Sequence, residues 1–305
     1  MRKVFINTLI EVAEKDKRIF LLTGDLGFSV LEPFRENFPD RFFNMGVAEQ
    51  NMIGVAAGLA LSGKIVFCYS IVPFVTMRCF EQIRNDLCFQ NLNVRLVGVG
   101  GGIEYGPAGF SHYAREDIAI MRSLTNMTVV VPANDAEVKS AIQESIKYPG
   151  PIYIRLGKDV PLNLNFKKFR IGKATVLKRG KDIAIISGGS ILSLAREIVE
   201  SLEQHNLSCS LINMPTVKPI DVNLLIDLIR RQKAIFVIED HNIIGGLGSA
   251  VAEVVAEAKN KIIFKRFGLP DYYHKFIGRA NFLLKRYGLS AEDITKKILQ
   301  SLKGI

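Results

Sequence analysis

The sequence predicts an α/β protein with two domains and mostly parallel sheets. Its 305 residues are enough for two cores, at roughly 100–200 residues per domain. Short apolar runs alternate with segments of helical periodicity, which is typical of parallel α/β sheets. The alternation stops over residues 157–170, GKDVPLNLNFKKFR, and then restarts. We therefore expect a first domain over residues 1–157, a linker over 158–174 and a second domain over 175–305.

The first domain should open with an amphipathic helix over residues 3–15, because Phe5, Leu9 and Val12 share one face at helical spacing. Short apolar runs that end at glycine, proline or polar residues predict strands over 19–22, 64–69, 94–99, 127–131 and 151–156. The segments between them predict helices over 49–61, 76–89, 116–124 and 135–147. Asn134 or Asp135 should cap the last of these helices.

The second domain repeats the pattern. Apolar runs predict strands over 182–187, 209–213, 234–238 and 262–266. Helices are expected over 191–204, from the cap Asp221 to about 231, and from the glycine-rich segment 245–248 to about 258. A final helix should begin at Ser290, with Asp293 three residues on as a variant capping box.

The net charge of +10 could indicate nucleic-acid binding, but the basic residues are spread along the chain. We expect no nucleic-acid partner; an anionic substrate, an anionic cofactor or an acidic subunit fits the charge as well. No apolar run reaches the roughly 18 residues of a membrane span, and the N-terminus has no signal-peptide core. We expect a cytoplasmic protein that does not bind membranes.

Cysteine and histidine patterns indicate no metal chemistry. The four cysteines form no CxxC pair and lie among apolar residues, so we expect reduced core thiols. The four histidines form no HExxH pattern, so no metal site made by this chain alone is expected. Glycines at 98 and 100–102 lie at the end of a predicted strand, but position 103 is isoleucine, which breaks the GxGxxG spacing of dinucleotide-binding proteins.

The segment 43–60 contains one acid, Glu49, among small and apolar residues. A buried carboxylate without a partner is costly. The side chain is therefore either exposed at a helix start, where the helix dipole favours it, or held inward for a purpose. The local pattern leaves both readings open.

The wider sequence resembles the transketolase family. NMGVAEQNMIGVAAGLALSGKIVF, residues 44–67, is similar to the motif that opens the cofactor helix of the pyrimidine-binding domain. Matching segments follow in family order: GDLGFS from 24, RCFEQIR from 78, HYAREDIAIMR from 112, VVPAND from 130, PIYIRLG from 151, and EDH with GGLGSA from 239 and 245. The resemblance covers almost the whole chain and implies a thiamine-diphosphate-binding fold followed by a transketolase C-terminal domain.

The resemblance assigns cofactor-binding roles to Asp25, Leu26, Glu49 and Phe74. Glu49 would form a hydrogen bond to N1′ of the aminopyrimidine ring of thiamine diphosphate and promote the tautomer that acts as the cofactor's own base. A carboxyl group that shares a proton near neutral pH works best in a dry site. Phe74 would stack on the aminopyrimidine, although the match is imperfect, because the family usually has aromatic residues at the positions of Val72 and Val75.

The same resemblance assigns substrate-binding roles to Ser29, His112 and Arg155. Ser29 and Arg155 would contact substrate phosphates, and His112, a catalytic residue with Glu49, would bind the reacting oxygens of the sugar. Two departures make the usual pentose phosphates doubtful. Ala108 stands where the family has an aspartate that recognises a substrate hydroxyl. The family often has a histidine near Val99 or Gly100, and this sequence has none there.

The sequence also lacks the GDG motif that, in the family, begins the site for the diphosphate and magnesium. We therefore expect a second polypeptide, the N-terminal section of a split transketolase, to hold the diphosphate and Mg²⁺, in an α2β2 assembly. The resemblance implies transfer of a two-carbon ketol unit between sugars.

Three other readings remain. The chain could be the β subunit of a 2-oxo acid dehydrogenase or a deoxyxylulose-phosphate-synthase relative, which donor assays with pyruvate would reveal. It could be a non-catalytic assembly subunit, against which Glu49 and His112 argue. Nucleic-acid binding predicts a steep salt dependence of affinity for DNA.

Overall fold

The computed structural model describes residues 1–157, 169–273 and 275–303. The first half contains the strands β1 (Ile19–Thr23), β2 (Phe42–Asn44), β3 (Ile65–Ile71), β4 (Val94–Val99), β5 (Thr128–Val130) and β6 (Ile152–Leu156). Its helices are α1 (Arg2–Ala13), α2 (Glu32–Asn37), α3 (Glu49–Leu61), α4 (Val72–Thr76), α5 (Phe80–Gln82), α6 (Asp117–Ser123) and α7 (Asp135–Ser145). A π-helical segment covers Ile83–Cys88, and short 3₁₀ turns cover Pro39–Arg41, Gly106–Ala108 and Phe110–His112.

The second half contains the strands β7 (Thr175–Lys178), β8 (Ile183–Ser187), β9 (Cys209–Asn213), β10 (Thr216–Lys218), β11 (Ala234–Asn242) and β12 (Ile263–Leu269). Its helices are α8 (Leu192–Glu203), α9 (Val222–Arg231), α10 (Leu247–Glu257), α11 (Ala280–Arg286) and α12 (Ala291–Leu302), with a 3₁₀ turn at Gly189–Ile191.

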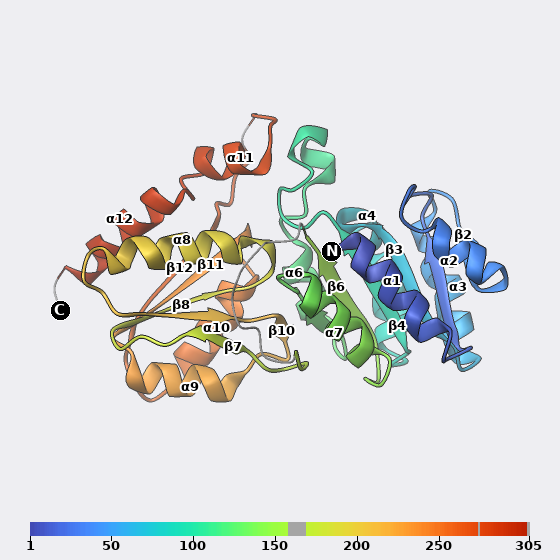
Figure 1. Cartoon of the computed structure of the whole chain (residues 1–305), viewed down its shortest axis with the longest axis horizontal. Coiled ribbons are helices and arrows are strands. Elements are labelled where there is room, and N and C mark those ends of the chain that lie inside the picture. The colour runs from blue at the N-terminus through green and yellow to red at the C-terminus, as the bar shows by residue number, and fades with distance from the viewer. Residues whose placement is uncertain (158–168, 274, 304–305) are drawn as a thin grey trace.

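Two sheets organise the described residues and lie side by side in Figure 1. One has the strand order β10-β5-β6-β4-β3-β1-β2, and the other β12-β11-β8-β9-β7. Only β10 with β5 and β7 with β9 pair antiparallel in these sheets of the described chain. The predicted α/β class with two mostly parallel sheets is confirmed.

Helices cover both faces of the first sheet, so its central strands are apolar on both sides. Phe67 and Val97 pack in a core with α1 and α7, whereas Cys68 and Leu96 pack in a core with α3 and α4. Successive strand residues point to opposite faces, and this alternation divides the side chains of β3 and β4 between the two helical layers. All four cysteines are buried free thiols, as expected.

Three helices begin at side-chain caps that the sequence predicted. The side chain of Asn134 accepts a hydrogen bond from the backbone N–H of Glu137, Asp221 from Leu224, and Ser290 from Asp293. Each cap satisfies a backbone donor that the first helical turn leaves without a partner.

The single helix predicted over 76–89 is wrong. The chain instead forms α4, a break at Met77–Cys79, then α5 and the π-helical segment. Pro73 lies in the first turn of α4, where proline is tolerated, and the hydroxyl of Thr76 donates to the carbonyl of Val72. Helix α4 therefore starts at Val72, four residues before the predicted start at 76, and it ends at Thr76 instead of continuing to 89.

The two halves share a sheet, which the sequence did not predict. Strand β10, from the second half, pairs with β5 at the edge of the first sheet. The ammonium group of Lys218 donates to the carbonyls of Arg122 at 3.0 Å and Leu124 at 2.5 Å. Most of the expected linker, residues 158–168, lies outside the described residues, and the domain boundaries stay a prediction.

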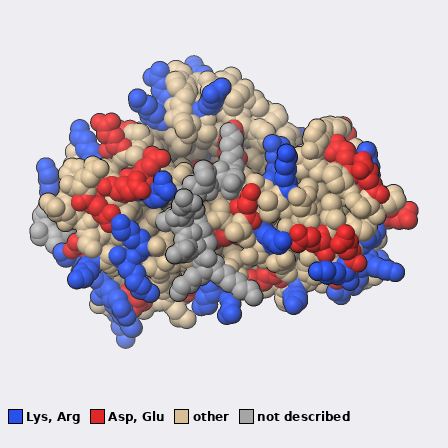
Figure 2. All heavy atoms as spheres, in the orientation of Figure 1, with Lys and Arg blue, Asp and Glu red and all other residues tan. Residues whose placement is uncertain are grey.

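The charges are dispersed on the face shown in Figure 2, where basic and acidic side chains are interspersed. The net charge of +10 is thus not gathered into one basic patch on that face. Among the described residues, none of the helices has the length and apolar character that a bilayer crossing requires.

Candidate active site

Glu49 lies inside the protein rather than on its surface. It is the first residue of α3, and its side chain is 1% exposed. The hydroxyl of Ser70 donates to Glu49 Oε1 at 2.8 Å, and Nη1 of Arg78 donates to Oε2 at 2.6 Å. Of the two readings that the sequence left open, the exposed helix-start glutamate is excluded.

The carboxyl edge of the first sheet positions this side chain. Gly24 follows β1 and Ser70 lies near the end of β3, and these strands are parallel neighbours. In open α/β sheets, ligands bind outside the carboxyl ends of the strands. A Cβ on Gly24 would lie 2.8 Å from Glu49 Oε1, so only glycine leaves room for the carboxylate at this position.

Phe74 and His112 lie close to Glu49, linked to it through Arg78. The guanidinium carbon of Arg78 is 4.2 Å from the centre of the Phe74 ring, while Arg78 also contacts Glu49. The rings of Phe74 and His112 meet edge to face with centroids 5.4 Å apart. His112 Nδ1 shares a hydrogen bond with the hydroxyl of Ser111 at 3.0 Å, which leaves Nε2 as the ring nitrogen that can face a substrate. The structure thus brings Glu49, Phe74 and His112 together.

Asp25, Leu26 and Ser29 lie on the loop that follows Gly24. Asp25 and Ser29 have positive φ values of 55° and 62°, which non-glycine residues adopt mainly in specialised loops. The side chain of Asn44 donates to Asp25 Oδ1 at 2.9 Å and accepts from the backbone N–H of Asp25 at 3.0 Å. Asp25 and Ser29 are exposed and Leu26 is partly exposed, so the loop can be reached from outside.

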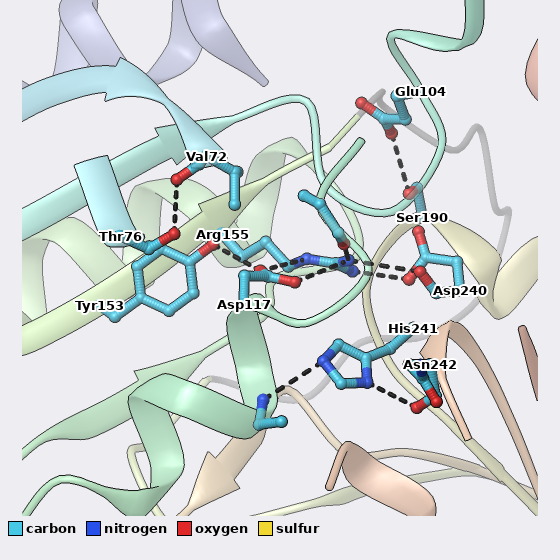
Figure 3. A network of polar contacts seen from close by, with 12 residues as sticks. Val72, Thr76, Glu104, Asp117, Tyr153, Arg155, Ser190, Asp240, His241 and Asn242 are labelled. Carbon is cyan, nitrogen blue, oxygen red and sulfur yellow. Dashed lines mark hydrogen bonds and ion pairs between the residues drawn. The ribbon is translucent and has the colours of Figure 1, made fainter. Parts of the chain in front are cut away.

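Arg155 is placed differently, because it is buried between the two halves of the chain (Figure 3). Its Nε donates to Asp117 Oδ2 at 2.9 Å and its Nη1 to Asp240 Oδ1 at 2.6 Å. The hydroxyl of Tyr153 also donates to Asp117, at 2.6 Å. The guanidinium is therefore committed to carboxylates from both halves. Its predicted role in binding phosphate is not supported by this placement and stays a prediction.

His241 extends the contact between the halves (Figure 3). Its Nε2 accepts from the backbone N–H of Ala119 at 3.2 Å, and its Nδ1 lies 2.7 Å from the carbonyl of Asn242. Burial lowers the pKa of His241, so the ring is neutral, with Nδ1 as donor and Nε2 as acceptor.

Sequence reasoning missed four residues of the site: Gly24, Ser70, Arg78 and Tyr105. A side chain at Gly100 would collide with the Tyr105 ring, since a Cβ there would be 2.0 Å from two ring carbons. Tyr105 also faces His112, with ring centroids 6.3 Å apart. The ring of Tyr105 thus takes the space beside the position where the resemblance led us to look for a histidine. Gly100, with the aromatic residue Tyr105 five positions on, was the available clue in the sequence.

The contacts of Arg78 test whether an aminopyrimidine would fit. Its guanidinium is a flat group that donates to Glu49 and lies over the Phe74 ring. The chain therefore has the acceptor and the aromatic face that the ring of thiamine diphosphate requires. In the described part of the chain, histidine, cysteine and acidic side chains form no cluster suited to a metal ion.

The fold and the site define a two-domain α/β protein with a buried glutamate at the carboxyl edge of its first sheet. Residues 1–161 match the transketolase pyrimidine-binding domain, and residues 172–294 match the transketolase C-terminal domain. The chain belongs to the transketolase family, a family that uses thiamine diphosphate.

Several relatives match this chain over most of their own length. A Methanocaldococcus jannaschii protein, provisionally named as a transketolase C-terminal section, is 42% identical over 99% of this chain and 96% of its own length. One of the subunits of the apulose-4-phosphate transketolase of Actinobacillus succinogenes is 36% identical over 87% of this chain and 86% of its own length. A solved structure described as a split gene transketolase, an inactive β4 tetramer, has a TM-score of 0.90 and 38% identity, and covers 99% of this chain and 98% of the other.

The similarity extends to a second enzyme type. The 1-deoxy-D-xylulose-5-phosphate synthase of Shouchella clausii is 35% identical over 98% of this chain. The chain spans 48% of that protein's length.

Proposed function

We propose that this chain is the catalytic subunit of a two-subunit, thiamine-diphosphate-dependent transketolase that transfers a two-carbon ketol unit between sugars. The observation that carries the proposal is the buried Glu49 carboxylate, which Arg78 links to the neighbouring rings of Phe74 and His112. Relatives that match over most of their length, one named as a transketolase C-terminal section and another as a transketolase subunit, support it.

The residues of the chain have separate tasks in this mechanism. When bound, thiamine diphosphate supplies the nucleophilic carbon and the electron sink. Ser70 orients the Glu49 carboxyl, which holds a proton at N1′ of the ring. The flat face of Phe74 fixes the ring plane. His112 presents Nε2 to the oxygens of the sugar, and Ser111 sets the orientation of its imidazole.

A second polypeptide completes the proposed enzyme. Relatives that match over most of their length are named as a transketolase C-terminal section and as a transketolase subunit, so we assign the diphosphate and Mg²⁺ to an N-terminal-section subunit. The related split-gene structure is described as an inactive tetramer of β chains, which agrees with a requirement for a second type of subunit. We propose an α2β2 assembly in which the loop of Asp25, Leu26 and Ser29 faces the substrate and the N-terminal section.

The substrate is proposed to be a specialised sugar phosphate rather than a common pentose phosphate. Ala108 cannot form the hydrogen bond to a substrate hydroxyl that an aspartate would, and the ring of Tyr105 lies beside His112. A net charge of +10 suits an anionic substrate.

Co-expression with the N-terminal section tests the proposal. The purified complex should transfer a ketol unit from a ketose phosphate to an aldose, whereas the chain alone should not. Glu49→Ala should lower kcat by at least about 100-fold, the usual range for loss of acid–base assistance. Glu81→Ala is the matched control, because Glu81 is an exposed glutamate on the nearby helix α5. Equal turnover by the Glu49 variant would refute the catalytic role and favour a non-catalytic, assembly role.

The second candidate is a deoxyxylulose-phosphate-synthase-type reaction, which the 35% identity over 305 residues favours. This reaction would use pyruvate as donor. Carbon dioxide release from pyruvate in the presence of glyceraldehyde 3-phosphate, without turnover of ketose phosphates, would select it over the transketolase reaction.

A further inference from the structure

We propose that Arg78 is a placeholder for the cofactor ring: its guanidinium occupies the aminopyrimidine position and must leave before thiamine diphosphate binds. The inference rests on the proposed function, because it assumes that Glu49 and Phe74 receive this cofactor. It concerns a residue to which neither the resemblance nor the relatives assign a role.

Two contacts define the position of Arg78. Nη1 donates to Glu49 Oε2 at 2.6 Å, and the guanidinium carbon lies 4.2 Å above the Phe74 ring. One planar group therefore makes both contacts that the aminopyrimidine would make: a donor to the glutamate and a stack on the phenylalanine. Two planar groups cannot make the same stack on one face of Phe74.

The buried carboxylate explains why a placeholder is useful. Glu49 is 1% exposed, and an unpaired charge at that depth would destabilise the fold. Ser70 satisfies Oε1 by a neutral hydrogen bond, and Arg78 supplies the opposite charge at Oε2. Arg78 thus pairs with the buried Glu49 carboxylate and holds its orientation in the cofactor-free chain.

The side chain of Arg78 can move away from Glu49 and Phe74 without unfolding of the surrounding chain. Its side chain is 37% exposed, and it lies in the break between α4 and α5 rather than inside a helix. Rotation of its side-chain torsions would move the guanidinium into solvent, where it is well hydrated. Once the ring replaces it, Glu49 has a partner with which it can share a proton, which an arginine does not allow because its guanidinium stays protonated.

Competition between Arg78 and the cofactor predicts an unusual result: removal of a site residue should tighten cofactor binding. The test is calorimetric titration of the complex of this chain and its N-terminal-section partner with thiamine diphosphate at saturating Mg²⁺. Arg78→Met should lower the Kd by about 5- to 30-fold, equal to about 1 to 2 kcal/mol at 1.4 kcal/mol per tenfold. Arg78→Gln is measured in parallel, in case the methionine variant fails to assemble. Arg84→Met is the matched control, since Arg84 is exposed and its guanidinium donates to the side chain of Asn85.

Each possible result of the titration either supports or overturns the inference. Tighter binding by the Arg78 variants, with the Arg84 variant unchanged, supports the placeholder. Weaker binding would mean that Arg78 is a cofactor ligand, and an unchanged Kd would mean that the ring binds elsewhere than under Arg78; both overturn the inference. A wild-type complex that binds no thiamine diphosphate would refute the proposed function itself, and the inference with it.

Discussion

Glu137 should make the stability of this protein depend on pH near neutrality. Its side chain is buried on α7 at the junction of the two halves. Oε2 accepts from the backbone N–H of Ala133 at 2.8 Å, and Oε1 accepts from the side chain of Asn213, on β9, at 2.6 Å. Burial raises the pKa of Glu137 from its ordinary value of 4.5 to about 7, because these two neutral donors offset only part of the desolvation of the charge.

The sign and size of the effect follow from proton linkage. Between pH 4.5 and about 7 the folded protein binds more protons at Glu137 than the unfolded chain does. The stabilisation is therefore complete below pH 4.5 and is lost as pH rises through about 7. A shift of about 2.5 pH units corresponds to about 3 kcal/mol. Glu239, whose pKa burial raises to about 8, contributes with the same sign.

Glu137→Gln removes the titration without removing the side chain. Asn213 Oδ1 is buried without a hydrogen-bond partner in the described residues, so the amide of Asn213 can flip and accept from the new glutamine. At pH 8 the variant should melt about 6 °C above the wild type, at about 2 °C per kcal/mol, and the two should converge toward pH 5. Thermal unfolding by calorimetry across pH 5–8 measures this, with Glu144→Gln on α7 as the control for loss of one negative charge. A variant that melts below the wild type at pH 8 would refute the reasoning.

Three further outcomes are expected. Ser70→Ala should lower kcat of the complex by about 10- to 100-fold, since a hydrogen bond to a carboxylate contributes about 1.5 to 3 kcal/mol; a change below twofold would contradict the orienting role. Gly24→Ala should reduce activity at least as much, because its Cβ would lie 2.8 Å from Glu49 Oε1, and cofactor titration should reveal weaker binding in a folded protein. Asp240→Asn should destabilise the protein by about 2 kcal/mol or more, because Arg155 loses one of two buried carboxylates; calorimetry checks this, and an unchanged melting temperature would count against the network.

Local sequence patterns predicted the elements well where the cause is local. Helix α3 begins at Glu49 and ends at Leu61, as the apolar spacing indicated, and β4 and β9 have the predicted bounds. The prediction failed at 76–89, where the chain breaks at Met77–Cys79 between α4 and α5 and then continues as a π-helical segment. Strand β10 was missed because three residues have too little periodicity to mark them as a strand.

The α/β class, the helix caps and the family could all be inferred from the amino-acid order, because each depends on spacing within a few positions or on ordered motifs. The groups that touch the Glu49 carboxylate could be identified only in the folded protein. Ser70 is 21 residues from Glu49 and Arg78 is 29, while Arg155 meets Asp240 across 85 residues. Such contacts are set by how strands order in a sheet and how the two halves pack, and no local pattern encodes the neighbours that this packing brings together.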